Sequence, residues 1–288
     1  MIDVFLAIAC SVLVSALLKL ARRFEVDVGQ AIAWNYAVAS ALVALMLQPD
    51  TAVLRNVAVP WLALIGLGLL LPTIFLALGA SVRHAGIVRS DAAQRLSLLL
   101  SLPAAFVFFG ESLRPAAAVG IVLGLLALTA MLWRTAPSST TPAPANAARW
   151  GYPLLVLAGF GLIDILFKRV AQAGVPLGTS LQAMFALALP VAFALALWRR
   201  WREGTRFTAR NLLGGVLLGL FNFGNILFYL RGHRALPDHP ALVFASMNIG
   251  VVALGALVGM AVFRERLSRL NLAGVLLAAL AIGWIAWP

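Results

Sequence analysis

The sequence predicts an all-α membrane protein with ten transmembrane helices, arranged as two five-helix repeats of inverted topology. The first observation behind this prediction is composition: of 288 residues, 62% are hydrophobic and 11% are charged, and the mean hydropathy is +0.98. Soluble domains have about a quarter of their residues charged. The second observation is a glutamate turn between two apolar runs that occurs twice, which indicates a duplicated unit.

Ten apolar runs supply the predicted spans, since a helix needs about 20 mostly apolar residues to cross a bilayer. The runs lack the period-two alternation of barrel strands, so we expect helices, which satisfy their own backbone in lipid. The runs are Ile2–Leu20, Ala31–Leu47, Val59–Ala80, Ala92–Phe109, Pro115–Trp133, Tyr152–Val170, Leu177–Trp198, Asn211–Leu230, Pro240–Phe263 and Arg269–Trp287.

A tract of Pro, Ser, Thr and Ala separates the fifth run from the sixth and is typical of a flexible linker. We therefore expect a first repeat over residues 1–134, a linker over 135–149 and a second repeat over 150–288. Glu111 overlays Glu265 at a shift of 154 positions, and Tyr36 overlays Phe185 when the second spans of the halves are aligned. Five spans in each half give the halves opposite orientations in the membrane.

Lysine and arginine gather in the connections after the odd-numbered spans. By the positive-inside rule these connections are cytoplasmic, and both termini lie on the periplasmic side of a bacterial inner membrane. The net charge of +12 is thus explained by helix ends, without nucleic acid. The start of the chain lacks the basic region of a cleavable signal peptide, so the first run is expected to remain as a span. Cys10 is the single cysteine, which excludes an intramolecular disulfide.

Ten spans in two halves, with Gly110–Leu113 and Glu265–Leu267 forming the turn before the last span of each half, resemble the drug/metabolite transporter superfamily. Within it the chain is most similar to EamA-type bacterial exporters, and the resemblance covers nearly the whole sequence. It implies a secondary transporter that exports small metabolites, foremost aromatic or aliphatic amino acids. The first span has no acidic residue beyond Asp3, unlike the small four-span drug exporters. We expect a monomer without a cofactor, surrounded by membrane lipids.

Two other functions stay open. A drug, nucleotide-sugar or phosphate-ester carrier of the same superfamily is less favoured, because such anionic substrates need several buried basic residues and Arg95 alone lies well inside a span. A membrane enzyme acting on lipid-linked substrates would need clustered acidic or histidine residues at one membrane face. His233 and His239, beside Asp238 in a short polar loop, are a weak metal signal. We therefore expect neither enzymatic activity nor a metal site.

Polar groups within the spans are the candidate substrate ligands, since ionisable groups there cost about 2.5–3.5 kcal/mol on insertion scales. Arg95 can hold a carboxylate bidentately, or it reaches the interface if the fourth span starts later. Gln94 overlays Asn248 in the register of the glutamates, so we expect this pair in a central cavity. The remaining candidates, for which interhelical hydrogen bonds or an interfacial aromatic belt are the alternatives, are Asn222, Asn225, Tyr229, Trp34, Tyr36 and Gln182.

Asp164 and Lys168 lie four residues apart on one helix face. This spacing suits an internal ion pair or proton or ion coupling, and Lys168 also matches Lys19 as a membrane anchor. Glu111 and Glu265 are expected to be structural caps that meet the positive N-terminus of the following helix. Small residues at Gly120-x-x-x-Gly124, Gly215-x-x-x-Gly219 and Gly255-x-x-x-Gly259 would allow close helix approach.

Overall fold

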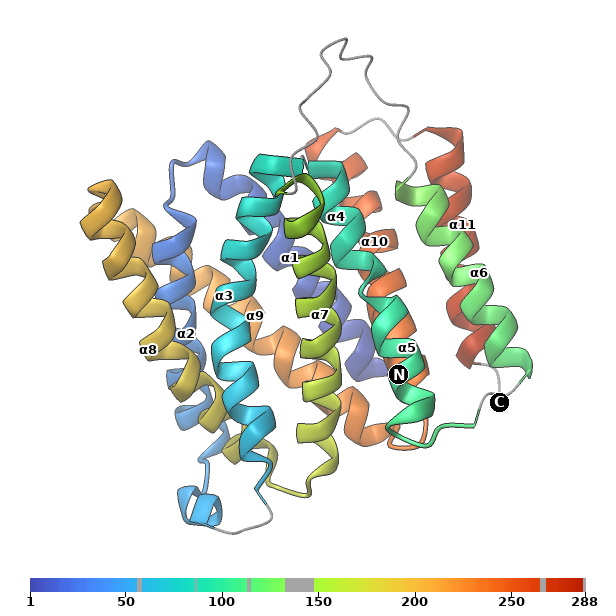
Figure 1. Ribbon diagram of the computed structural model, residues 1–288, viewed down its shortest axis with the longest axis horizontal. Coiled ribbons are helices and arrows are strands. Elements are labelled where there is room, and N and C mark those ends of the chain that lie inside the picture. Colours follow the sequence, from blue (N-terminus) through green and yellow to red (C-terminus); the bar gives the residue numbers. More distant parts are fainter. Residues whose placement is uncertain (56–58, 86, 113–114, 133–147, 265–267, 287–288) are drawn as a thin grey trace. The chain divides into compact units, whose positions relative to one another are not determined.

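The computed structural model describes residues 1–55, 59–85, 87–112, 115–132, 148–264 and 268–286. Over these residues the chain is helical and contains no β-strand, which confirms the predicted all-α class (Figure 1). The elements are α1 (Ile2–Arg23), α2 (Val28–Leu47), η1 (Thr51–Arg55), α3 (Trp61–Ala85), α4 (Ile87–Leu96), α5 (Leu98–Val107), α6 (Pro115–Leu132), α7 (Ala148–Gln172), α8 (Leu177–Glu203), α9 (Ala209–Ala235), α10 (Pro240–Phe263) and α11 (Arg269–Ala286).

The fourth predicted span, Ala92–Phe109, is helical over Ala93–Val107 apart from a one-residue turn at Ser97, which separates α4 from α5 and keeps α-helical backbone angles. The Ser97 hydroxyl donates to the Gln94 carbonyl at 2.7 Å. The Leu100 amide in turn bonds the Ser97 carbonyl at 2.8 Å, which tightens the turn. A serine hydroxyl that binds a carbonyl of the preceding turn competes with the helix ladder and bends helices.

Six helical segments in the described part of the chain are long and apolar enough to cross a membrane: Ile2–Ala21, Val28–Leu47, Trp61–Ser81, Leu177–Glu203, Ala209–Ala235 and Pro240–Val262. Three shorter apolar segments are Ala93–Val107, Ala118–Ala130 and Arg269–Trp284. Large apolar side chains lie on the outside of these helices, with Leu62 86% and Leu45 77% exposed. Exposed apolar surface on this scale suits lipid contact, so the fold fits a multi-pass membrane protein.

The helices form two compact units, and each unit combines segments from both halves of the sequence. Unit 1 contains Met1–Leu76 and Ile163–Pro237, and unit 2 contains Ala77–Leu162 and Asp238–Pro288. The borders fall inside α3 and α7, so these helices contribute to both units. The predicted repeats are a different division of the chain and stay a prediction, and most of the predicted linker lies outside the described residues.

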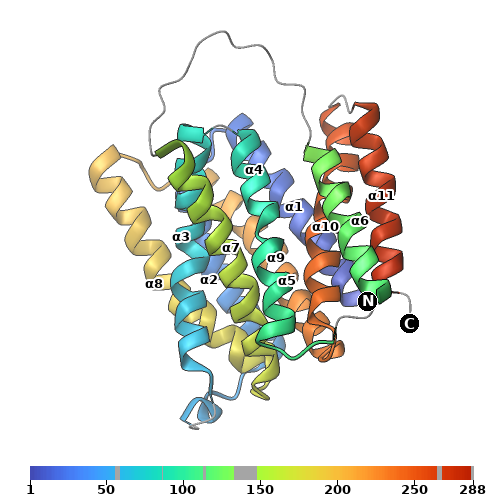
Figure 2. The same cartoon turned by 45° about the vertical axis from the view of Figure 1, so that its right-hand side comes forward.

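In unit 1, α2 packs against both α8 and α9, and α1 packs against α9. Figures 1 and 2 show α2 and α8 side by side. A Cβ atom on Gly219 would come within 2.7 Å of Val38 Cβ and 2.9 Å of the Asn35 carbonyl oxygen, and Gly215 lies equally close to Trp34. The predicted close approach at Gly215-x-x-x-Gly219 is therefore confirmed, with α2 as the partner helix.

In unit 2, α6 and α11 pack along their length, as Figures 1 and 2 show, and α10 packs against α5, α6 and α11. Gly124 lies against the side chains of Ile249 and Ala281, so small residues again bring helices together. The Asn271 amide donates to the Ala130 carbonyl at 3.0 Å and ties the start of α11 to the end of α6. Gly255, in contrast, faces open space, so the predicted close approach was wrong there.

Candidate functional site

The interface between α2 and α8 brings together two of the predicted substrate ligands. Tyr36 is fully buried, and its ring centroid lies 6.3 Å from that of Phe185. One turn further along α2, Ser40 accepts a hydrogen bond of 2.7 Å from the Gln182 amide nitrogen. The Tyr36 hydroxyl and the Gln182 amide oxygen have no hydrogen-bond partner among the described residues. This interface therefore holds polar atoms with spare hydrogen-bonding capacity inside an apolar helix pair.

Trp34 and Asn35 extend the polar and aromatic character of α2. The Trp34 ring meets Phe193 edge to face, with centroids 5.2 Å apart. Asn35 is 1% exposed, and its side-chain oxygen has no hydrogen-bond partner in the described part of the chain. Trp34 is thus packed against another helix of unit 1.

The predicted polar face of α9 lies within unit 1 as well. Asn222 is buried, whereas Asn225 is half-buried with an unpartnered side-chain oxygen. Tyr229, one turn further along, is buried and donates its hydroxyl to Asp164 Oδ1 at 2.8 Å. Tyr229 therefore has a carboxylate partner, whereas the Asn225 oxygen has no partner among the residues that the structure describes.

Asp164 and Lys168 lie at the α7–α9 contact. Lys168 is fully buried, and its ammonium donates to the Pro237 carbonyl at 2.6 Å. The interpretation of Lys168 as a membrane anchor was wrong, because an anchor extends to the interface. Lys19, its equivalent in the first half, is exposed.

His233 belongs to this cluster, although the sequence suggested a polar loop. It lies within α9, is 1% exposed and has its ring 4.8 Å from the Tyr229 ring. Lys168 is near enough to act on it electrostatically. Phe167 closes the cluster from α7, with its ring 5.7 Å from Tyr229. A lone histidine in sequence carries no signal for this burial, which arises from tertiary packing.

Gln94, Arg95 and Asn248 lie in unit 2. Gln94 and Arg95 occupy the last turn of α4 and are half-buried. Asn248 lies on α10, which contacts α4, and donates to the Phe244 carbonyl of its own helix at 3.1 Å. The predicted pair of Gln94 and Asn248 is thus carried by two helices in contact.

Glu111 has a partner that differs from the predicted one. Its carboxylate accepts a hydrogen bond of 2.7 Å from the Ala241 amide, in the first turn of α10, and its side chain is 8% exposed. His239 Nδ1 lies 3.9 Å from the other carboxylate oxygen. Glu111 therefore caps α10, a helix from the other half, whereas the expected contact with the following helix, α6, stays a prediction. Glu265 lies outside the described residues.

One end of unit 1 holds a polar network that the sequence reasoning missed. Asp27 caps α2 by accepting from the Gln30 amide at 2.8 Å, and its own amide donates to the Asn211 side chain at 2.9 Å. The Asn211 amide nitrogen donates to Gln30 Oε1 at 2.8 Å. Arg199 pairs with Asp27 at 3.4 Å and with Glu203 at 2.9 Å. An aspartate directly before an apolar run is an N-cap signal, but its partners on α8 and α9 have no local signature.

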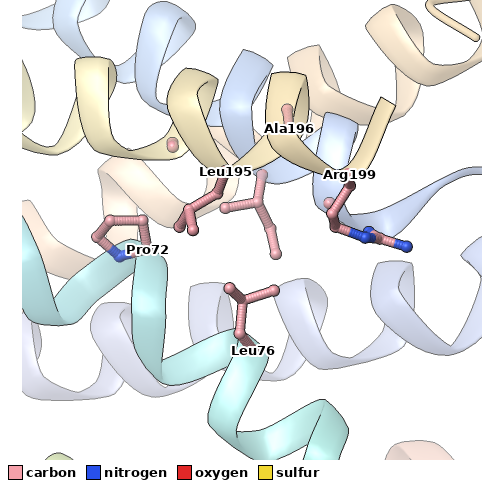
Figure 3. A pocket seen from close by; sticks show the side chains of 8 residues that line it. Pro72, Leu76, Leu195, Ala196 and Arg199 are labelled. Atoms are coloured by element: carbon pink, nitrogen blue, oxygen red, sulfur yellow. The ribbon is translucent and has the colours of Figure 1, made fainter. Parts of the chain in front are cut away.

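A small pocket lies beside this network, between α2, α3 and α8 (Figure 3). Its walls are mostly apolar, and Arg199 supplies the charged group at one end. None of the predicted substrate ligands lines it. The lining residues are Gly29, Ile32, Pro72, Leu76, Ala192, Leu195, Ala196 and Arg199.

Comparison with known proteins identifies a relative and a shared fold. An uncharacterized protein of Haemophilus influenzae is 41% identical over 287 residues, which cover 97% of this chain and 96% of that protein. A crystal structure of a protein superposes with a TM-score of 0.75 at 18% identity, over 98% of this chain and 96% of the other. At that identity the likeness shows the fold alone. No family model matches the sequence.

Proposed function

We propose that this chain, which belongs to the same family as the uncharacterized Haemophilus influenzae protein, is a secondary transporter of the bacterial inner membrane. It exports small metabolites, foremost aromatic or aliphatic amino acids, by alternating access. Ten helices cross the membrane, and both termini lie on the periplasmic side. The resemblance to the drug/metabolite transporter superfamily supports this proposal, and so do two features of the helix packing.

The first feature is the antiparallel packing of α2 and α8, which are equivalent helices in the two predicted repeats. Trp34, early in α2, lies against Phe193, late in α8, whereas Leu47 at the end of α2 lies against Gly178 at the start of α8. Tyr36 contacts Phe185, its own equivalent. Under two-fold symmetry, equivalent residues touch beside the axis. This packing supports a pseudo-two-fold axis perpendicular to the helices, as an inverted repeat requires.

The same construction recurs in unit 2, where α6 and α11 are the equivalent pair. Ala130 near the end of α6 is bonded to Asn271 near the start of α11, and Gly124 lies near Ala281 towards the end of α11. The two helices therefore run antiparallel. One equivalent pair in each unit supports two repeats of opposite orientation in the membrane.

The observation that carries the transport proposal is a set of buried polar atoms of unit 1 that lack a hydrogen-bond partner among the described residues. The set includes the Tyr36 hydroxyl and the side-chain oxygens of Asn35, Gln182 and Asn225. Burying such a group without a hydrogen bond costs about 1–3 kcal/mol. A purely structural helix bundle gains nothing from this cost, whereas a transporter needs vacant hydrogen-bonding groups along the substrate path.

These vacant groups are neutral, and aromatic rings lie on the same helix pair: Tyr36 lies against Phe185, and Trp34, next to Asn35 in the chain, lies against Phe193. Neutral donors and acceptors combined with aromatic surfaces suit a small zwitterion with an apolar side chain better than a phosphate ester, which needs clustered cations. We therefore assign substrate contact to Tyr36, Gln182, Asn222 and Asn225.

Counterflow in proteoliposomes tests this function. Vesicles preloaded with an unlabelled amino acid should take up the radiolabelled form, with L-phenylalanine and L-leucine as the first probes. A nucleotide sugar and a cationic dye serve as the alternative substrates. Uptake of either alternative without movement of any amino acid would contradict the substrate class, and no counterflow with any probe would contradict transport itself.

A further inference from the structure

We infer that the buried cluster of Asp164, Lys168, Tyr229 and His233 is a proton-binding site that couples export to the proton gradient. This inference rests on the proposed transport function and adds its driving force. A proton would bind at the Asp164 carboxylate, and its inward movement would drive substrate outward. Sequence spacing left an ion pair or coupling as alternatives for Asp164 and Lys168; the packing of α9 adds Tyr229 and His233.

Asp164 can keep its bond to Tyr229 in both protonation states. Its Oδ1 accepts the Tyr229 hydroxyl at 2.8 Å. When the carboxylate binds a proton it becomes a donor, and a tyrosine hydroxyl can accept as well as donate. The same contact therefore survives in both states with its roles reversed, so the helices α7 and α9 stay joined throughout a cycle.

Lys168 balances the charge of the site. Asp164 and Lys168 together carry no net charge while the carboxylate is ionised, and proton uptake leaves the site with one positive charge. A buried ammonium without an acceptor would be costly. The Pro237 carbonyl at 2.6 Å gives the Lys168 ammonium an acceptor that does not titrate. The lysine thus remains bonded after Asp164 is neutralised.

Within the described residues, the titratable members of the cluster are Lys168 on α7 and Tyr229 and His233 on α9. Arg234, the next residue on α9, donates to the Val175 carbonyl, a different acceptor at the start of α8. His233 is 1% exposed and packs on the Tyr229 ring. Ionisable groups at this density inside a membrane bundle are expensive and typically mark proton or ion paths.

The cluster also touches the chain where one compact unit ends. Pro237, whose carbonyl binds Lys168, is the last residue of unit 1, and Asp238 is the first residue of the following segment of unit 2. Lys168 therefore fixes the last residue of unit 1 through its carbonyl group.

Infrared difference spectroscopy tests proton binding without any substrate. Purified full-length protein in liposomes is compared at alkaline and acidic pH, and the carbonyl band of a protonated carboxylic acid is followed. The wild-type protein should show the band. The control Asp238→Asn, which removes an exposed carboxylate just after the end of α9, should show it as well. Asp164→Asn should lose it. Persistence of the full band in Asp164→Asn would overturn the inference.

If Asp164→Asn does not fold, Asp164→Glu takes its place, because it keeps a carboxylic acid. The band should then move to a new position, and an unchanged band would show that another residue binds the proton. Tyr229→Phe sharpens the assignment by removing the hydrogen bond to the ionised carboxylate. The pH midpoint of the band should rise by about one unit, and an unchanged midpoint would remove Tyr229 from the site.

Two transport measurements, counterflow and accumulation, distinguish this inference from the proposed function on which it rests. Counterflow of L-phenylalanine requires only binding and alternation, whereas accumulation against a gradient requires coupling. A difference of one pH unit drives up to about tenfold accumulation for one proton exchanged. Asp164→Asn should lose this accumulation and keep counterflow. Wild-type counterflow without pH-driven accumulation would contradict the proton site alone, and absence of counterflow in wild type would contradict transport.

Discussion

The two compact units have similar apolar composition but use their polar side chains differently. In unit 1, polar side chains on different helices bond one another, as in Gln182 with Ser40 and Tyr229 with Asp164. In unit 2, the polar side chains described above mainly bond backbone groups, as Glu111 does at the start of α10. The difference indicates that unit 2 uses polar side chains mainly to fix helix ends, whereas unit 1 also uses them to join neighbouring helices.

The largest expected effect comes from breaking the close approach of α2 and α9 in unit 1. Gly219→Leu would drive a side chain into Val38 and the Asn35 carbonyl, and overpacking against backbone costs about 1–3 kcal/mol or more. We expect a large loss of folded protein in detergent, measured by size-exclusion chromatography after heating. Gly255→Leu is the matched control in unit 2, because its Cβ would enter open space. Equal loss in both variants would contradict the assigned contact.

A smaller effect is expected from the buried lysine of unit 1. Lys168→Met removes the donor to the Pro237 carbonyl and should lower the free energy of unfolding by about 1–3 kcal/mol. Lys19→Met, at the equivalent and exposed position of α1, should change it by less than about 0.5 kcal/mol. Thermal unfolding of both variants in the same detergent measures the difference. Similar melting temperatures would argue that the two lysines have the same environment.

The smallest effect on stability is expected at Tyr36, and it separates stability from function. Tyr36→Phe removes a buried hydroxyl that has no partner, so the melting temperature should stay the same or rise slightly. Counterflow of L-phenylalanine should nevertheless fall several-fold, by the loss of one hydrogen bond of about 0.5–1.5 kcal/mol to the substrate. Phe185→Leu at the opposing ring is the packing control. Unchanged counterflow in Tyr36→Phe would remove this hydroxyl from the substrate path.

The helices were predictable because most of them coincide with a long apolar run, and such a run must be buried in lipid or in protein. The turn at Ser97 was not predictable. Its hydroxyl bonds the Gln94 carbonyl, but nothing in the sequence marks which serine in a helix makes such a bond. The glutamate turn predicted that Glu111 caps a helix. It did not predict which helix, because the partner Ala241 is 130 residues away. Nothing local in the sequence encodes that distance.

For the candidate site, spacing on one helix was informative and pairing between helices was not. The face of Asn222, Asn225 and Tyr229 follows from helical periodicity. The bond from Tyr229 to Asp164 needs the packing of α7 on α9, as the burial of His233 does. The network of Asp27 and Arg199 was missed for the same reason. A charged residue at a helix end is normally expected to face solvent, and the sequence does not show that these two residues pair.

The interleaving of the two halves also governs how the chain is made. Asp27 and its hydrogen-bond partner Asn211 are 184 residues apart, a separation that takes a ribosome roughly ten to forty seconds to synthesise. During that interval α1 and α2 lack α9, against which both pack in the finished protein. Asp27 can bond Gln30 within the first half during this time, but the bonds of both residues to Asn211 form only after the second half has been made.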